Sequence, residues 1–317
     1  MSMASAIDEN LFKAHERFLW GLCYRMTGNA ADADDLVQET FVRALKHPPA
    51  RTDEPWRPWL VRVAINLGRD FLRRRKRQPY DGGWLPSPFE TGDESVPPSV
   101  EPVDEHGNPA AHYDLLESVS FAFLLALEAL TPTQRAVLLL RDVFDYSVRE
   151  TADALAISEP NVKTTHHRAR RAMDAYDRAR VVPTASLQER TRQALTSFLG
   201  CLARNDVAGI EALLAHDARQ LSDGGGEFHA ARVPIVGRAK LALFYGTAIR
   251  QAAKAERHVQ FEIRSLNGLP ALYVINPGAG PGYAPRLVLS FELDADGYIR
   301  RIYSVLASRK LTALRHA

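Results

Sequence analysis

Residues 147–171 read SVRETADALAISEPNVKTTHHRARR, and this stretch has the spacing of a helix-turn-helix. Ala152 occupies the close-contact position of the first helix, Ala156 the turn, and Val162 the buried position of the second helix. Ser158 is placed to cap that second helix. The same spacing also suits a plain αα-hairpin, but the dense basic end of the stretch favours a motif that binds nucleic acid.

Helical patterns extend on both sides of this stretch. Thr131-Pro132-Thr133-Gln134 predicts a capping box with proline at the first helical position, and helices are expected from Tyr113 to Leu130. Nearer the N-terminus, apolar spacing predicts one helix that ends near Thr27, a second from about Ala31 to Lys46 and a third that begins near Trp59. The first part of the chain is therefore expected to be all-α.

The second and third of these helices each carry two faces. In the second, Val37, Phe41 and Ala44 are expected to face inward, which leaves a polar set for another surface: Asp35, Gln38, Glu39 and Arg43. In the third, the expected apolar stripe is Leu60, Val63, Ala64, Leu67 and Phe71. A basic stripe with one amide recurs on its other side, and it suits a phosphate backbone: Arg62, Asn66, Arg69 and Arg73.

Charge along the chain is uneven although the net charge is only +2. Lys and Arg are dense over residues 51–77 and again over 163–171, but residues 78–134 contain neither. The acidic stretch between the clusters is rich in Pro and Gly, so residues 79–112 are expected to form a linker. Two basic modules around an acidic connector suit a polyanionic partner, while solvated helix faces and a soluble loop are the plain alternative.

The composition changes after Val182-Pro183, and the remainder is expected to be α+β. Residues 187–214 read as two helices and residues 237–254 as a third. Alternating apolar residues predict strands around Val259 to Ile263, from Leu287 to Leu293 and near Ile302, with a hairpin turn at residues 294–297.

Three motifs occur in a fixed order: residues 34–41 (DDLVQETF), Pro58-Trp59-Leu60 with Asn66, and the helix-turn-helix that ends at Arg171. Together they closely resemble an extracytoplasmic-function (ECF) sigma factor of bacterial RNA polymerase, from Asp8 to about Arg180. The remainder is similar to the cone-shaped, SnoaL-like α+β extension of one subgroup. Residues 80–86 (YDGGWLP) resemble the linker motif of that subgroup, and residues 223–226 (DGGG) resemble its glycine-rich loop.

This resemblance implies a multidomain fold: two all-α sigma domains, a helical bundle and a helix-turn-helix, followed by a SnoaL-like domain. The expected boundaries are 8–78 for the region 2 bundle, 79–112 for the linker, 113–180 for the region 4 helix-turn-helix domain and 187–317 for the α+β domain. The sequence departs from the subgroup pattern at Glu227, where lysine is usual, at Ala156, where glycine is common, and over residues 306–311, which keep only the last two residues of a tail motif, Lys310-Leu311.

The resemblance also implies partners: core RNA polymerase and promoter DNA. Core polymerase would contact Asp35, Gln38, Glu39 and Arg43, and the minus-ten element would meet Arg62, Asn66, Arg69 and Arg73. Trp56 and Trp59 could stack on unpaired bases, although Trp59 could instead anchor the bundle core. At the minus-thirty-five element, Glu159, Asn161 and Thr164 would face bases, while phosphates would be bound by Lys163, His167, Arg168 and Arg171.

A regulatory contact within the chain is also expected. The Trp84-Leu85-Pro86 cluster is too apolar to stay solvated, and Gly224, Gly225 and Gly226 permit close approach of a backbone. We therefore expect the linker to pack near Asp223 to Glu227 and the extension to tune sigma activity in cis. An independent domain on a tether is the alternative.

Catalysis is not expected. His166 and His167 are adjacent on a helix, no Cys or carboxylate set has metal-ligand spacing, and no cofactor motif occurs. The polar candidates for a cavity in the C-terminal domain are Asp223, His229, Tyr245, His258 and Tyr273, and a small-molecule ligand for that domain is left open. Two other functions are considered: a dimeric helix-turn-helix repressor, and a DNA-binding module fused to a SnoaL-like enzyme. With no signal peptide or membrane span in the sequence, a cytoplasmic location is expected, and Cys23 and Cys201 are expected to be buried thiols.

Overall fold

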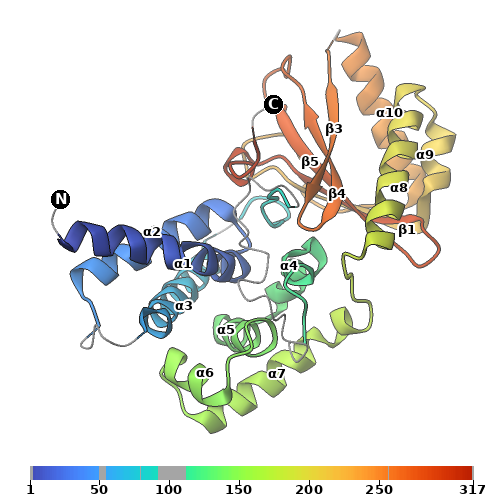
Figure 1. Ribbon diagram of the computed structural model, residues 1–317. Coiled ribbons are helices and arrows are strands. Elements are labelled where there is room, and N and C mark those ends of the chain that lie inside the picture. The colour runs from blue at the N-terminus through green and yellow to red at the C-terminus, as the bar shows by residue number, and fades with distance from the viewer. Residues whose placement is uncertain (1–2, 50–54, 79, 92–111, 256, 316–317) are drawn as a thin grey trace. The chain divides into compact units, whose positions relative to one another are not determined.

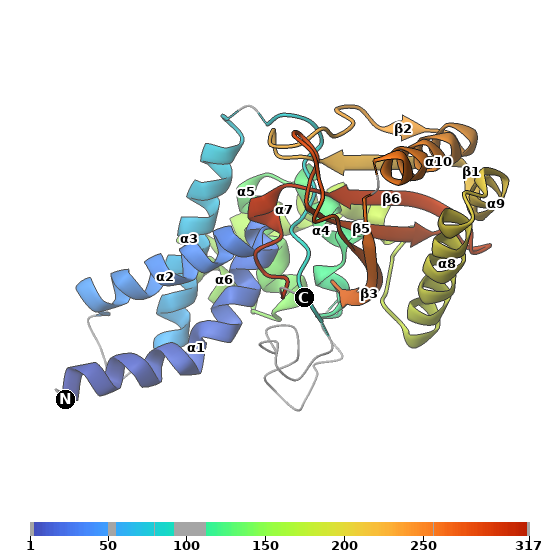
Figure 2. The ribbon, with the colours of Figure 1, turned by 90° about the horizontal axis from the view of Figure 1, so that it is seen from above.

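A computed structural model describes residues 3–49, 55–78, 80–91, 112–255 and 257–315 (Figures 1 and 2). The chain divides into two compact units. The helical unit comprises Met1–Gln78 and Asp93–Val182, and the α+β unit comprises Pro79–Gly92 and Pro183–Ala317. Most of the acidic connector, residues 92–111, lies outside the described residues. Among the described helices, none is long and apolar enough to cross a membrane.

The helical unit begins with α1 (Met3–Thr27), α2 (Ala30–Lys46) and α3 (Trp56–Arg75), which pack against one another. The side chain of Asn29 caps α2 by accepting from the backbone N–H groups of Ala31 and Asp32. The apolar stripe predicted for α3 needs correction, because Val63 and Phe71 are only half-buried. The helix is covered by α1 and α2 and also by α5 and α6, so its buried face is broader than one stripe: Leu60, Val61, Ala64, Ile65, Leu67, Gly68 and Leu72.

The second half of this unit contains α4 (Phe121–Ala126), α5 (Pro132–Leu138), α6 (Val148–Leu155) and α7 (Glu159–Asp177). The long helical stretch expected before Leu130 is instead broken into α4 and two 3₁₀ turns, Glu117–Val119 and Leu127–Ala129. The break occurs at Ser120, whose extended backbone and side chain cap α4. The predicted capping box at Thr131 and Gln134 is confirmed, with both hydrogen bonds present. A π-helical segment, Leu139–Val143, follows α5.

The helix-turn-helix is confirmed as α6 and α7. Ser158 caps α7 as predicted, and Ala152 and Val162 are buried at 7% and 0% exposure. Ala156 ends α6 in the left-handed conformation with φ of 53°. Glycine, which has no Cβ, adopts this conformation with the least strain, so Ala156 is strained relative to glycine at the same position.

The α+β unit contains a six-stranded sheet in the order β2-β1-β6-β5-β4-β3. All neighbouring strands are antiparallel except β1 and β6, which are parallel. The strands are β1 (Leu214–Asp223), β2 (Ile235–Val236), β3 (Gln260–Leu266), β4 (Leu269–Ile275), β5 (Arg286–Leu293) and β6 (Ile299–Val305). The helices α8 (Ala185–Ala203), α9 (Val207–Leu213) and α10 (Arg238–Lys254) lie together beside the sheet (Figure 1).

The core of this unit lies between those helices and the sheet. Phe198 of α8 packs edge-on against Tyr245 of α10 and Phe291 of β5, with ring centroids 5.0 and 5.2 Å apart. The three predicted helices and the strands near 259–263, 287–293 and 302 are confirmed, while β1, β2 and β4 were not anticipated. Residue 214 begins a strand and does not end a helix. The predicted fold class, two helical modules followed by an α+β domain, is confirmed.

Candidate functional site

The polar set predicted on α2 lies together at the surface. Asp35, Gln38, Glu39 and Arg43 are all exposed, opposite a buried face that includes Val37 and Phe41. Arg43 pairs with Glu39 at 2.8 Å, but both side chains are about half exposed, so the pair contributes only about 0.3–0.5 kcal/mol and can exchange for an external partner.

Two apolar side chains on the same surface were missed from the sequence. Val42 is 40% exposed and Leu45 is 56% exposed, and both lie on the polar side of α2. Their exposure could have been predicted, because each falls outside the helical spacing of the buried residues Val37, Phe41 and Ala44. A surface that mixes charges with exposed apolar groups suits a protein partner.

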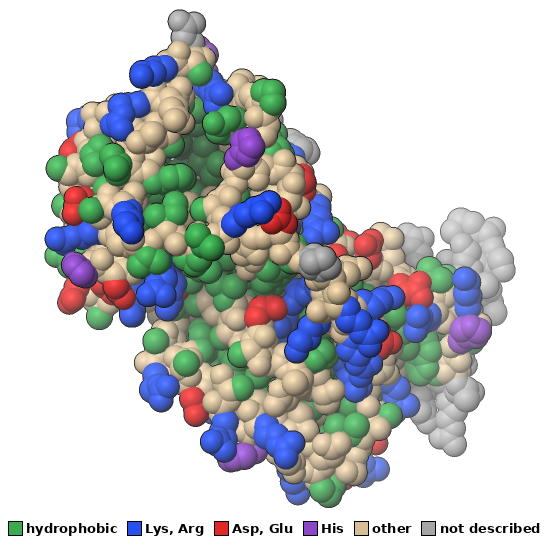
Figure 3. Space-filling model, turned by 180° about the vertical axis from the view of Figure 1, so that it is seen from behind, with side chains coloured by type: hydrophobic (Ala, Val, Ile, Leu, Met, Phe, Trp, Pro, Cys, Tyr) green, Lys and Arg blue, Asp and Glu red, His purple; other side chains and the backbone are tan. Residues whose placement is uncertain are grey.

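The basic stripe on α3 is only partly open. Arg62 and Arg73 are exposed, whereas Asn66 and Arg69 are half-buried. Arg69 donates from Nη1 to Asn66 Oδ1 at 3.3 Å and from Nη2 to Thr133 Oγ1 at 3.2 Å. Lys and Arg side chains gather on the helical unit near the C-terminal end of α3 (Figure 3), where the last turn carries three arginines. This end of the helix offers positive charge to a polyanion.

The two tryptophans at the start of α3 lie side by side. Trp56 and Trp59 are both half-buried, and their rings meet edge to face with centroids 6.3 Å apart. Such a pair leaves part of each ring accessible for stacking while the rest packs on the protein.

Helix α7 separates its buried and open residues cleanly. Val162, Ala169 and Met173 face the core, and the predicted contact residues are all exposed: Glu159, Asn161, Lys163, Thr164, His167, Arg168 and Arg171. The inward side is held by His166, whose Nε2 lies 2.8 Å from Asp142 Oδ1. The adjacent histidines therefore point to different sides, as expected, and the exposed side can enter a DNA groove without disturbing the core.

Two predicted base-contacting residues on α7 already make local hydrogen bonds. Thr164 Oγ1 donates to the carbonyl of Pro160 at 3.0 Å, and Thr165 Oγ1 donates to Asn161 Oδ1 at 3.1 Å. The amide oxygen of Asn161 is thereby engaged within the helix, while the side chain as a whole stays exposed.

The α+β unit contains a buried polar cluster between its linker segment and its sheet. Asp223, at the end of β1, and Lys310 are both fully buried and form an ion pair of 2.6 Å. Asp223 also accepts from the backbone N–H of Leu85 at 2.8 Å and from the Tyr80 hydroxyl at 2.6 Å, while Lys310 Nζ donates to the Leu85 carbonyl. Linker and extension therefore share one hydrogen-bonded network, which we call the linker anchor.

Aromatic rings cover the linker anchor. The Lys310 ammonium lies 4.5 Å from the centroid of the Trp84 ring and 5.1 Å from that of Tyr80. Leu85 and Pro86 are buried, and Trp84 is half-buried. Burial strengthens these cation–π contacts, and it also raises the pKa of the Tyr80 hydroxyl, to which its hydrogen bond with the Asp223 carboxylate contributes.

The glycine-rich loop lies against its own domain and beside the linker. Gly225 and Gly226 have φ of 59° and 75°. A Cβ on Gly225 would lie 2.8 Å from the Ala307 side chain, and one on Gly224 would lie 2.7 Å from the Phe228 carbonyl oxygen. These glycines allow the loop to turn tightly against its own domain, and the linker comes close at Asp223, which it hydrogen-bonds, and at Gly226, where a Cβ would lie 3.8 Å from the Asp81 side chain.

A second linker contact was missed by the sequence analysis. Thr91 N donates to the Ser265 carbonyl at 2.9 Å and Asn267 N donates to the Phe89 carbonyl at 3.1 Å, so the linker pairs with the outer edge of β3. Glu90 forms an ion pair of 3.0 Å with Arg264, and both side chains are largely buried. A pairing between residues so far apart in sequence leaves no local signal.

Lys310 was missed as a site residue, although the sequence contains a feature that points to it. It belongs to the two residues that the tail keeps from the resembled motif, yet it was not selected as a site residue. Glu227, which stands where the motif has lysine, accepts weakly from the backbone N–H of Ser308 at 3.3 Å.

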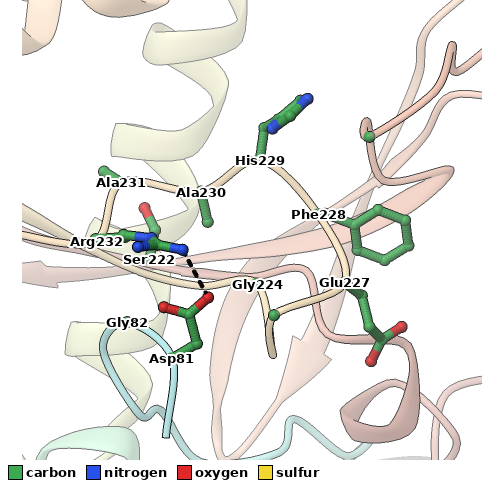
Figure 4. A pocket seen from close by; sticks show the side chains of 12 residues that line it. Asp81, Gly82, Ser222, Gly224, Glu227, Phe228, His229, Ala230, Ala231 and Arg232 are labelled. Carbon is green, nitrogen blue, oxygen red and sulfur yellow. Dashed lines mark hydrogen bonds and ion pairs between the residues drawn. The ribbon is translucent and has the colours of Figure 1, made fainter.

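A shallow pocket lies beside the linker anchor. It has a volume of about 250 Å³ and is lined by Asp81 and Gly82 of the linker, the loop from Ser222 to Arg232, and Gly282. Figure 4 shows Asp81 and Arg232 facing one another across it, with an ion pair of 3.0 Å, while Glu227 and His229 point away from that pair. Its lining is largely polar, and the Asp81–Arg232 ion pair within it is exposed.

The polar candidates for chemistry in this unit do not converge on one cavity. Asp223 lies in the linker anchor, Tyr245 donates to Gln220 Oε1 at 2.6 Å inside the core, and Tyr273 packs under the Arg264 guanidinium. His229 and His258 are exposed. Among the described residues, no group of three or more His, Cys, Asp or Glu side chains is placed to hold a metal ion. Cys23 and Cys201 are buried free thiols, as predicted, and burial raises the pKa of Cys23 to about 12.

Comparison with known proteins agrees with this arrangement. The Sigma-70 region 2 family matches residues 11–78, and the Sigma-70, region 4 family matches residues 120–173. The ECF RNA polymerase sigma factor SigJ of Mycobacterium tuberculosis is 30% identical over 235 residues, which cover 74% of this chain and 70% of that protein. SigG of the same organism is 39% identical over 172 residues, or 50% of this chain and 46% of that protein.

A solved structure extends the likeness to the α+β unit. The crystal structure of M. tuberculosis SigJ matches with a TM-score of 0.68 and 24% identity, and the match covers 96% of this chain and 98% of that one. At this identity the match shows a shared fold, from the first helices to the last strands.

Proposed function

This chain belongs to the ECF sigma factors of RNA polymerase, and from this premise we propose which of its surfaces bind core polymerase and which bind promoter DNA during transcription initiation. As a member of this family it is an alternative sigma factor, which binds core RNA polymerase and directs initiation at specific promoters. The α2 surface binds core polymerase, the α3 stripe with Trp56 and Trp59 binds the minus-ten element, and α7 reads the minus-thirty-five element.

The observation that carries this assignment is the separation of faces on α7. Its core residues are buried, and its open side combines groups suited to bases, such as Asn161, with cations suited to phosphates, such as Arg168. The exposed charged and apolar groups of α2 support the polymerase assignment, because a protein partner recognises such a mixture better than a nucleic acid does.

The second part of the proposal is regulation in cis by the extension. The Asp223–Lys310 pair is fully buried. If the linker left its place, the two charged groups would be partly uncovered and would lose their Leu85 and Tyr80 partners. Buried charges need such partners, and the docked linker is therefore the stable state. Docking shortens the free connector between the two DNA-binding modules and limits their separations.

The extension has this regulatory role and no catalytic one, in line with the dispersed positions of its polar candidates. The domain division proposed with it is 8–78, 79–112, 113–180 and 187–317, with the first part of the linker held by the extension. The site of action is the cytoplasm, where core polymerase transcribes.

Run-off transcription with core polymerase on a promoter library tests the whole proposal. The full chain should give promoter-specific transcripts, and a chain without residues 187–317 should give an altered yield or promoter range. Trp84→Ala should reproduce part of that change, and Tyr298→Ala, which removes an exposed ring away from the linker, is its matched control. Promoter-specific transcripts that are the same for all four proteins would refute the regulatory part while leaving the sigma function intact.

A further inference from the structure

Helix α7 is held to the rest of the helical unit by polar side chains as well as by packing. His166 Nε2 lies 2.8 Å from Oδ1 of Asp142, whose side chain is largely buried. Because a carboxylate only accepts hydrogen bonds, His166 donates this one from Nε2. Arg170 Nη1 lies 3.5 Å from the other oxygen, Asp142 Oδ2, which is buried and has no hydrogen-bond partner among the described residues. We call Asp142, His166 and Arg170 the α7 polar contact.

The backbone around Asp142 holds it in place. It lies in the π-helical segment Leu139–Val143, and its carbonyl accepts from the Tyr113 N–H at 3.0 Å. Tyr113 is fully buried, and its hydroxyl donates to Asp177 Oδ1 at the end of α7, 2.8 Å away. Single π-helical turns are rare and are frequent at functional positions. The carboxylate that holds His166 is therefore fixed both to its own segment and, through Tyr113, to the end of α7.

The α7 polar contact lies just behind the turns that are proposed to read bases. His166 is seven residues after Glu159, the first residue of α7, so about 10 Å of helix precedes the contact. Asn161 and Thr164 also lie in that part of the helix. A tilt of about 10° at His166 would move the start of the helix by about 2 Å, which exceeds the range of distances over which a hydrogen bond to a base edge forms.

Packing alone defines the orientation of α7 less sharply. Val162, Ala169 and Met173 bury the inner side of the helix without a directional bond. Apolar contacts are non-directional, whereas a hydrogen bond weakens steeply as its angle changes. The α7 polar contact supplies the directional element, and its side chains are not part of the exposed set that is proposed to touch DNA.

We propose that Asp142 and His166 are positioning residues for promoter reading. The hydrogen bond between them sets the angle at which the first turns of α7 enter the major groove, and it thereby determines base preference at the minus-thirty-five element without a contact to DNA. This inference rests on the proposed role of α7. Arg170 belongs to the basic run of α7, but it is turned towards Asp142 and balances the charge of that carboxylate.

The test compares His166→Ala with His166→Gln in the full chain bound to core polymerase. Glutamine carries its amide nitrogen as many bonds from Cα as Nε2 is in histidine, so it can still donate to Asp142, whereas alanine cannot. The measured quantity is the ratio of the holoenzyme's affinities for a promoter found by run-off transcription and for the same promoter with one base pair changed in the minus-thirty-five element. A residue that only stabilises the fold changes the amount of active protein and leaves this ratio unchanged.

His166→Ala should lower the ratio by about fivefold, and His166→Gln should retain most of it. The salt slope should stay the same in both, because no phosphate contact is lost. Asp142→Ala should lower the ratio to the same extent, and the double variant should be no worse than either single variant, because both changes remove the same hydrogen bond. Asp174→Ala removes an exposed carboxylate from the same helix and should leave the ratio unchanged.

A wild-type ratio in His166→Ala, or an equal loss in His166→Gln, would overturn the inference. Asn161→Ala, measured in parallel, separates this failure from a failure of the proposed function. If Asn161→Ala lowers the ratio and His166→Ala does not, α7 reads the element but His166 does not position it. If Asn161→Ala also leaves the ratio unchanged, the proposed role of α7 is wrong and the inference falls with it.

Discussion

In the α+β unit, Asp223 and Lys310 form an ion pair with both side chains fully buried, whereas the proposed contact residues of α2 and α7 lie open at the surface of the helical unit. A buried charge must find its partner within the folded chain, and the Leu85 backbone and the Tyr80 hydroxyl complete that set. Exposed groups such as Asn161 and Arg168 keep unused hydrogen-bonding capacity. Burial thus separates contacts that the chain makes with itself from contacts that require a second molecule.

The largest expected effect comes from breaking the buried pair. Lys310→Met leaves Asp223 as an uncompensated buried charge, and loss of one partner from such a pair costs about 3–5 kcal/mol. Differential scanning calorimetry should show a lower transition for the α+β unit while the transition of the helical unit stays in place. The double variant Asp223→Asn with Lys310→Met should regain part of the loss, and a single variant as stable as the wild type would show that the pair is not a source of stability.

The exposed α2 surface should respond in affinity and not in stability. Asp35→Lys together with Glu39→Lys should weaken binding to core polymerase by about 100-fold, because like charges placed across an interface cost several kcal/mol. Circular dichroism should be unchanged, since both side chains lie opposite the buried face. Glu189→Lys on α8, also exposed, serves as the control. Equal affinities for the double variant and the wild type would remove α2 from the polymerase contact.

The two kinds of contact on α7 can be told apart. Asn161→Ala should cost about 1–3 kcal/mol of discrimination at one base pair, whereas Arg168→Ala should weaken binding to all sequences and lower the salt slope by about one. Promoter binding by the reconstituted holoenzyme, measured over a range of salt concentrations, reports both quantities. If the two variants behave alike, the placement of α7 in the groove is wrong.

The smallest expected effect is a pH dependence of the contact that Glu128 makes with Arg75 of α3 and Arg135 of α5, whose ion pairs are intermediate in burial between the buried and exposed cases. Burial alone would raise the pKa of Glu128, but Arg135 and Arg75 outweigh it and hold that pKa below 4.5. The stabilisation is therefore fully present above about pH 4.5 and is lost as the pH falls through the lowered value. The thermal transition of the helical unit should fall over that acid range in the wild type and less in Glu128→Gln, and identical pH profiles would exclude Glu128 as the titrating group.

The features that could be predicted from the sequence depend on residues close together in the chain. The capping box at Thr131, the cap at Ser158 and the buried Val162 are short-range features, so the helix-turn-helix could be located to within a few residues. Strand β1 was missed because its exposed positions include His216, Asp217 and Arg219, which interrupt the apolar alternation.

Contacts between distant residues could be predicted only in outline. The Trp84 cluster indicated that the linker would dock, but nothing near Glu90 indicates its pairing with Arg264 or the strand pairing with β3. In α3, Asn66 and Arg69 were expected to be as open as Arg62, and only the fold shows that both are half-buried and that Arg69 reaches Thr133 of α5. Periodicity identifies which face of a helix is polar and does not reveal whether another helix lies on it.

The pairing of residues 89–91 with β3 also bears on self-association. Strand β3 is the outer strand of the sheet, and the linker occupies its hydrogen-bonding edge between Ser265 and Asn267. If the linker is released, those backbone groups lose their partners, and an unpaired strand edge is a template on which a second chain can add a strand. A docked linker thus protects the protein against edge-to-edge aggregation. Release of the linker would leave this edge of the extension open to strand addition by a second chain.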